Sequence, residues 1–374
     1  TGRMNRSLDY RTDFYSLGVT FYELLTQQVP FEGKDAMEFV HSHIAKQPKP
    51  PDKINSEIPR IISNIVMKLL AKTAEERYQS AWGLMADLEE CLRQLQNTGQ
   101  IEEFSLARQD ISDKFQIPQK LYGRQTEIKT LIETFDRVNE GTTEMMLIGG
   151  YSGIGKSALV QEISKTIIRK EGNFIWGKFD QFQRSIPYSA VVKAFSELVP
   201  LLLSETEAKL KEWREKLLNS LGSNGQIMLD VIPELELIIG PQPPVQELGP
   251  TEAQNRFNLV FQNFIRLFCQ PEHPLVIFLD DLQWADSATL KLIKLMMTDD
   301  NTKYLFLIGA YRDNEVNVTH PLMMLVDGLR SQEEQEETAI VNEITLEPLE
   351  LKHITKLIAE TLHSDRSSVA PLAE

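Results

Sequence analysis

The sequence has few cysteines and no long apolar run. Cys91 and Cys269 are its two cysteines among 374 residues, which excludes a disulfide-stapled scaffold and is typical of a reducing compartment. The most apolar stretches, such as 275–279, are short and end in carboxylates, well below the run of about 18 residues that a membrane-spanning helix needs. The chain begins at Thr1 without a basic-then-apolar leader. We therefore expect a cytoplasmic protein with no membrane span and a cut N-terminal end.

Positive charge is also scarce. Lys and Arg number 39 against 54 Asp and Glu, a formal net charge of −15, and residues 96–374 hold 27 basic against 41 acidic side chains. Because so negative a surface repels a phosphate backbone, we expect no direct nucleic-acid partner. The composition is otherwise 42% hydrophobic and 25% charged, which matches an ordinary globular protein and excludes intrinsic disorder.

The spacing of apolar residues divides the chain into three zones. It is helical from Asp13 to about Gln96, within a predicted first domain of residues 1–96, and Ser80 can cap a helix whose apolar side chains recur every three or four positions. Residues 97–118 are polar, contain glycine and proline, and are typical of a linker. In residues 119–374 short apolar runs alternate with helical segments. This alternation predicts an α/β domain whose mainly parallel sheet is covered by helices on both faces.

Within the third zone, strands and helices can be assigned by period and length. The strands are expected at 144–148, 173–176, 275–279, 304–310 and 340–346, and the helices at 157–169, 190–203, 252–268, 288–297 and 350–362.

The strongest motif is GYSGIGKS, which runs from Gly150 to Ser157 between an apolar run and a helical one. It satisfies the P-loop pattern in the context that the pattern requires. Its glycines allow backbone amides to point at an anion, the following helix start favours negative charge, Lys156 supplies a cation for the β- and γ-phosphates, and the Ser157 hydroxyl can ligate magnesium. A chance glycine-rich turn is the alternative. The expected nucleotide contacts are Gly150, Gly153, Ile154, Gly155, Lys156, Ser157 and Ala158.

Two acids follow the apolar run 275–279. A carboxylate at the end of a buried parallel strand reaches the ligand crevice, so Asp280 is the expected magnesium partner and Asp281 can polarise the attacking water. The alternative for the acid pair is helix capping. Arg312 ends a later strand, where it can sense the γ-phosphate or simply form a surface ion pair with Asp313 or Glu315.

Together these motifs carry a family resemblance. LYGRQTEI, GYSGIGKS, LDDLQWAD and AYR occur in that order, and residues 119–374 resemble signal-transduction ATPases of the STAND class, close to the AAA-type group fused to bacterial regulators. The resemblance implies a sheet in which the Arg312 strand separates the P-loop strand from the second-acid strand, with a helical insert at about 190–270. Arg124, in the first motif, can line the adenine side, although a helix-entry turn explains it almost as well.

The first zone resembles the C-terminal part of a eukaryotic-type Ser/Thr kinase lobe. The stretch DFYSLG, beginning at Asp13, and LLAKTAEERYQSA, which contains Arg77, carry this resemblance. It implies that both residues are structural ties. The glycine-rich loop, the β3 lysine and the H-R-D and D-F-G motifs are absent from this sequence, so we expect no phosphotransfer to protein from this chain.

A kinase part joined to such an ATPase resembles large bacterial multi-sensor proteins, in which sensor and histidine-kinase modules follow. The expected function is a Mg-ATP-hydrolysing P-loop switch in a signalling protein whose parent is also a Ser/Thr kinase. The expected partners are ATP, other domains of the same polypeptide and other proteins. Whether a second copy of the chain is also a partner is left open. A non-hydrolysing, nucleotide-dependent scaffold and an ATP-driven DNA-loading factor are the alternatives.

Overall fold

The computed structural model describes residues 9–32, 39, 42–43, 46–110, 120–182, 186–203, 205–333, 340–362 and 364–374. The chain forms two compact units. The larger unit contains Arg124–Pro348, and the smaller contains Glu38–Gly123, Leu349–Glu374 and the N-terminal segment. The predicted boundary at 119 and positions 111–118 of the predicted linker lie outside the described residues.

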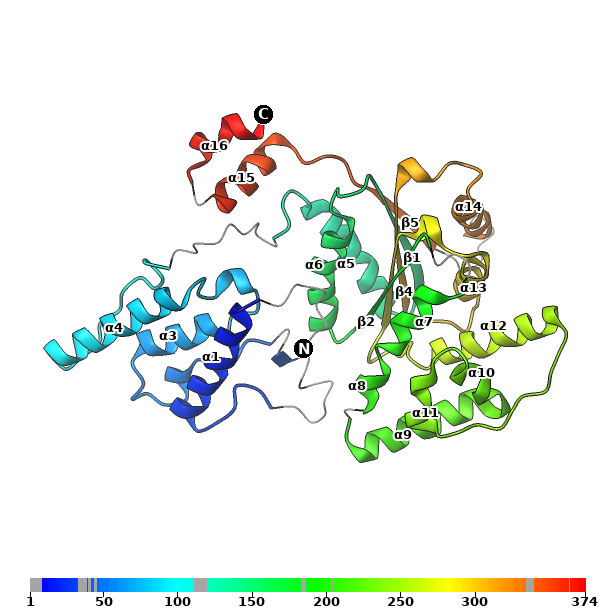
Figure 1. Ribbon diagram of the computed structural model, residues 1–374, viewed down its shortest axis with the longest axis horizontal. Coiled ribbons are helices and arrows are strands. Elements are labelled where there is room, and N and C mark those ends of the chain that lie inside the picture. The colour runs from blue at the N-terminus through cyan, green and yellow to red at the C-terminus, as the bar shows by residue number, and fades with distance from the viewer. Residues whose placement is uncertain are drawn as a thin grey trace. The chain divides into compact units, whose positions relative to one another are not determined.

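A five-stranded parallel sheet forms the centre of the larger unit (Figure 1). Its strands are β1 (Thr143–Gly149), β2 (Asn173–Lys178), β3 (Leu275–Asp280), β4 (Leu305–Tyr311) and β5 (Ile340–Thr345), in the order β2-β3-β4-β1-β5. The predicted strands are confirmed, and β4 lies between the P-loop strand and the second-acid strand as expected. Because all neighbouring strands are parallel, their carboxyl ends share one edge of the sheet.

Helices cover both faces of this sheet (Figure 1). On one face lie α5 (Gln125–Asn139) and α6 (Lys156–Arg169), and on the other lie α13 (Ser287–Met297) and α14 (Pro321–Glu333). Every residue of β1, β3 and β4 is buried. Double coverage explains why these strands are continuous apolar runs and do not alternate with polar residues.

A helical insert separates β2 from β3. It comprises α7 (Ser189–Ser196), α8 (Val199–Leu203), α9 (Glu207–Leu221), α10 (Gly225–Leu229), α11 (Glu236–Ile239) and α12 (Pro250–Arg266). The single helix expected at 190–203 is therefore wrong, since two helices occupy this stretch. Pro200 has no backbone N–H to donate to the carbonyl of Ser196, where α7 ends, and its ring crowds that carbonyl.

The smaller unit contains α1 (Arg11–Thr26), α3 (Arg60–Leu69) and α4 (Ala81–Thr98). The predicted cap of α4 is confirmed, because the Ser80 hydroxyl accepts a hydrogen bond from the Gly83 amide at 3.0 Å. Beyond α4, the chain packs back onto this unit through Ile101, Phe104 and Leu106. The Asp110 carboxylate anchors it by accepting hydrogen bonds from the backbone amides before α4. The first half of the predicted linker is therefore folded against the helices.

A pair of helices, α15 (Leu351–Thr361) and α16 (Arg366–Ala373), also belongs to the smaller unit. Glu360 accepts hydrogen bonds from the Tyr122 hydroxyl at 2.7 Å and from the Lys120 ammonium at 2.6 Å. None of the helices that the structure describes is both long enough and apolar enough to span a bilayer.

Candidate nucleotide-binding site

The P-loop connects β1 to α6 at the carboxyl edge of the sheet. Gly150, Gly153 and Gly155 have φ angles of 150°, 79° and 106°, a region that side chains other than glycine rarely adopt. A Cβ at Gly150 would also lie 3.0 Å from the Ile154 side chain. The glycine positions are therefore required by the backbone itself, and the loop leads into the N-terminal end of α6, where exposed Ser157 and Ala158 form the first turn.

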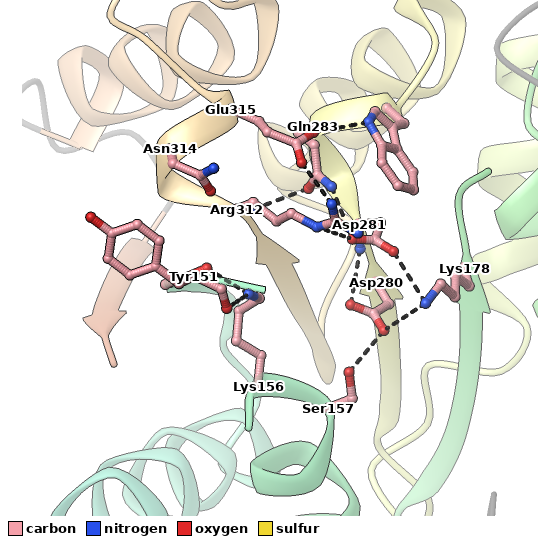
Figure 2. Close-up of polar contacts among 12 residues, drawn as sticks. Tyr151, Lys156, Ser157, Lys178, Asp280, Asp281, Gln283, Arg312, Asn314 and Glu315 are labelled. Carbon is pink, nitrogen blue, oxygen red and sulfur yellow. Dashed lines mark hydrogen bonds and ion pairs between the residues drawn. The ribbon is translucent and has the colours of Figure 1, made fainter. Parts of the chain in front are cut away.

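Lys156 lies across this loop (Figure 2). Its ammonium donates hydrogen bonds to the carbonyls of Gly150 at 2.5 Å and Tyr151 at 2.8 Å, and the residue is only 7% exposed. Burial lowers the pKa of Lys156, while Asp280 and Asp281 act in the opposite direction. A buried cation held by neutral carbonyls gains from exchanging one of them for an anionic oxygen.

Asp280, the first of the two acids, contacts the first turn of the P-loop helix α6. The Ser157 hydroxyl donates a hydrogen bond to Oδ2 of Asp280 at 2.9 Å, a contact drawn in Figure 2. Asp280 is 5% exposed, and its Oδ1 accepts a hydrogen bond from the Asp281 amide at 3.0 Å. A hydroxyl and a carboxylate from two elements thus converge on one point, and both are oxygen ligands of the kind that Mg²⁺ takes.

The second acid has an unusual backbone. Asp281 adopts φ 57° and ψ 43°, a left-handed conformation that is uncommon for a residue with a side chain and occurs often at functional sites. It precedes a 3-10 turn, Leu282–Trp284, yet within this described segment its side chain does not cap that turn. Its carboxylate and that of Asp280 both lie near the Lys178 ammonium (Figure 2). The capping alternative therefore does not describe Asp281.

Arg312 reaches the second acid from the end of β4. Its Nε lies 3.4 Å from Asp281 Oδ1, and one of its terminal nitrogens pairs with Glu315 at 2.7 Å. Trp284 packs under the guanidinium, 4.8 Å from the ring centre, and donates its indole N–H to Glu315 at 3.2 Å. The hydrogen bond with Glu315, followed by the attraction of Asp281, raises the pKa of Arg312. The ion pair with Glu315 that the alternative expects is therefore present, and γ-phosphate sensing by Arg312 stays a prediction.

Lys178 is a member of the site that the sequence analysis missed. It ends β2, in register with Asp280 on β3, and its ammonium lies 3.1 Å from Asp281 Oδ2 and 3.9 Å from Asp280 Oδ2. The side chain is 52% exposed. The predicted strand ended at 176, so no local signal marked Lys178, and it is the parallel register of β2 with β3 that brings it to the edge where strand ends meet.

Arg124 lies directly before α5 and contacts the segment that follows β5. The residue is 5% exposed, its guanidinium donates to the Glu347 carbonyl at 2.6 Å, and it pairs with Glu127 at 3.2 Å. These contacts tie the start of α5 to the segment that follows β5. They agree with the helix-entry explanation of this residue, and its role beside adenine stays a prediction.

Comparisons with known proteins show which family the chain belongs to. Residues 120–308 match the model of the AAA ATPase domain family. The hybrid signal transduction histidine kinase G of Dictyostelium discoideum is 42% identical over 317 residues, which cover 79% of this chain and 9% of that protein. A probable serine/threonine-protein kinase of Clostridium perfringens is 42% identical over 81 residues, 22% of this chain and 12% of that protein. This chain thus spans about a tenth of the length of these relatives.

Solved structures were compared as well. Cdc6p from Pyrobaculum aerophilum gives a TM-score of 0.37 at 10% identity, over 66% of this chain and 51% of that chain. The Aeropyrum pernix Orc1 protein, solved in complex with DNA, gives 0.35 at 16% identity over the same shares. The bacterial parent and the STAND class stay predictions. With a matched model over half of its residues and the predicted strand order in place, the chain belongs to the AAA ATPase domain family.

Proposed function

We propose that this chain is the ATP-hydrolysing switch module of a larger signalling protein. The observation that carries the proposal is the contact between Ser157 and Asp280, 2.9 Å apart. It joins the first turn of the P-loop helix to the second-acid strand beside a loop of three positive-φ glycines. These are the parts that hold a nucleoside triphosphate with its metal in P-loop proteins.

The residues present fit both ATP and magnesium. The amides of the glycine loop and of the start of α6 would bind the phosphates, and Lys156 would exchange a loop carbonyl for a phosphate oxygen. Ser157 and Asp280 would hold Mg²⁺, which neutralises phosphate charge when bound. Arg124 stays a proposed residue of the adenine side, with donors beyond the two that contact Glu127 and Glu347.

In the proposed hydrolysis step, Asp281 acts as the base beside the magnesium position. A water oxygen forms a bond to the γ-phosphorus while the bond from that phosphorus to the bridging β-phosphate oxygen breaks, which releases ADP. Asp281 accepts a proton from the attacking water and returns it to solvent. Lys156 and Arg312 stabilise the charge on the transferred group, a kind of contribution worth about 10³-fold or more where a guanidinium supplies it.

A non-hydrolysing scaffold is the second candidate, and one observation favours it. The Asp281 carboxylate lies 3.1 Å from the Lys178 ammonium and 3.4 Å from the Arg312 guanidinium. Two ion pairs restrict the movement of the carboxylate. Because the acid is then not free to turn toward an attacking water, a slow hydrolysis rate is expected in either case, as suits a switch.

The parent protein is proposed to be a multi-domain signalling kinase. The similarity to histidine kinases and, over 22% of the chain, to serine/threonine kinases supports this. We propose a cytoplasmic protein with domains at 1–96 (kinase-like), 97–118 (linker) and 119–374 (ATPase). Its proposed partners are sensor and histidine-kinase modules of the same polypeptide, and other proteins. A DNA-loading role stays the weaker alternative, because residues 96–374 carry 27 basic and 41 acidic side chains.

Single-turnover hydrolysis of γ-labelled ATP, with protein in excess, separates the two leading candidates. The switch proposal expects conversion to ADP and phosphate that depends on Mg²⁺. Binding of ATP by calorimetry without any conversion over hours would replace the switch with the scaffold.

A further inference from the structure

Gln283 connects the second acid to the end of β4. The residue is 2% exposed and lies in the 3-10 turn that follows Asp281. Its side-chain Nε2 donates to Asp281 Oδ1 at 2.9 Å, and its Oε1 accepts from the Arg312 backbone amide at 3.2 Å. Figure 2 shows both contacts.

The orientation of this amide group is fixed by its neighbours. A backbone N–H can only donate, so the Gln283 oxygen must face Arg312, and its NH₂ group is left to face the carboxylate. A buried amide with a partner at each end has little freedom to rotate. The Asp281 carboxylate is therefore held at a set distance from the end of β4, where Arg312 leaves the sheet.

We propose that Gln283 is the positioning residue of the ATPase site, which orients Asp281 toward the attacking water and couples that orientation to Arg312. This inference rests on the proposed hydrolytic function and extends it. Gln283 touches neither nucleotide nor water in this account. Its effect passes through the angle of the Asp281 carboxylate, and misplacement of a catalytic group by about 1 Å can cost about 10²-fold in rate.

The first test replaces the amide by a side chain of similar size without hydrogen bonds. Gln283→Leu should slow single-turnover hydrolysis by about tenfold to a hundredfold and leave the ATP dissociation constant within about threefold. The matched control is Gln262→Leu. Gln262, in α12 of the helical insert, is also buried, at 8% exposure, and its amide donates to the Leu295 carbonyl of α13 at 3.2 Å. The control should hydrolyse ATP at the parent rate.

A second variant keeps the shape and changes the charge. Gln283→Glu retains an acceptor for the Arg312 amide but places a carboxylate against Asp281. Like charges at hydrogen-bond distance repel each other, so the Asp281 carboxylate should leave the position that the amide gives it. Single-turnover hydrolysis should then slow while the ATP dissociation constant stays within about threefold. A parent rate in Gln283→Glu would count against the positioning role.

A double-mutant cycle with Asp281→Asn decides the inference. If Gln283 acts through Asp281, adding Gln283→Leu to Asp281→Asn should slow hydrolysis no further. Additive losses would overturn the positioning role, as would a parent rate in Gln283→Leu while Asp281→Asn is impaired. If the parent chain itself does not hydrolyse ATP, the proposed function is refuted. That outcome is distinct from additive losses in a chain that does hydrolyse ATP, which refute only the positioning role of Gln283.

Discussion

Replacing each of the two acids at the end of β3 by asparagine should give opposite results. Asp280 accepts the Ser157 hydroxyl at 2.9 Å, so Asp280→Asn removes a negative charge from the proposed magnesium position. A hydrogen bond to a charged group is worth about 1.5–3 kcal/mol. The dissociation constant for ATP in the presence of Mg²⁺ should therefore rise by roughly tenfold to a hundredfold.

Asp281→Asn should act on the rate. Asparagine tolerates the left-handed backbone at this position and keeps an oxygen that can accept from Gln283, so the fold and ATP affinity should be nearly unchanged. General-base assistance is typically worth about 10²–10⁴-fold, and single-turnover hydrolysis should fall by at least the lower figure.

Three measurements on both variants check this pair: melting temperature, ATP affinity by calorimetry, and single-turnover hydrolysis. A purely structural role for Asp281 predicts a small loss of stability and an unchanged rate per folded molecule. If Asp281→Asn hydrolyses ATP at the parent rate, the reasoning on its carboxylate is refuted.

Three further predictions follow from other parts of the chain. Lys156→Ala removes the cation that faces the phosphates, so ATP affinity should fall about tenfold to a hundredfold with the fold intact, and an unchanged calorimetric titration would contradict it. Burial, with Arg77 nearby, lowers the pKa of Lys72 from 10.5 to about 8. Because the unfolded chain then binds more protons between these values, Lys72 lowers stability below about pH 8, and this penalty should be relieved as the pH rises toward 10.5. Across this window the melting temperature of the parent should rise relative to that of Lys72→Met. A constant difference between the two melting temperatures would count against the burial argument. Finally, incubation with γ-labelled ATP should leave no label on protein substrates or on the chain itself, and label that survives purification would contradict the absence of a kinase site.

The sheet and the P-loop could be predicted from the sequence because their signals are local. Five apolar runs gave the strands within one or two residues at most ends, and the glycine spacing from Gly150 to Gly155 matches the positive φ angles found there. The strand order came only with the family resemblance. Local pattern does not record which strands are neighbours.

The missed features depend on contacts between distant segments. Lys178 is 102 and 103 positions before the two acids, and parallel register alone brings it beside them. The role of Gln283 depends on the Arg312 amide, which belongs to a different strand end. The break between α7 and α8 could have been predicted, because Pro200 stands inside the predicted helix. The packing of residues 101–110 could not be predicted, since Asp110 accepts hydrogen bonds from amides about 30 positions earlier.

The most direct test of the central claim follows γ-labelled ATP through a single turnover on the parent chain, with and without Mg²⁺. The account predicts that bound ATP becomes ADP and inorganic phosphate when Mg²⁺ is present, that chelating the metal stops this, and that Lys156→Ala shows neither tight binding nor turnover. ATP that binds to the parent chain in the presence of Mg²⁺ and is recovered intact would contradict it.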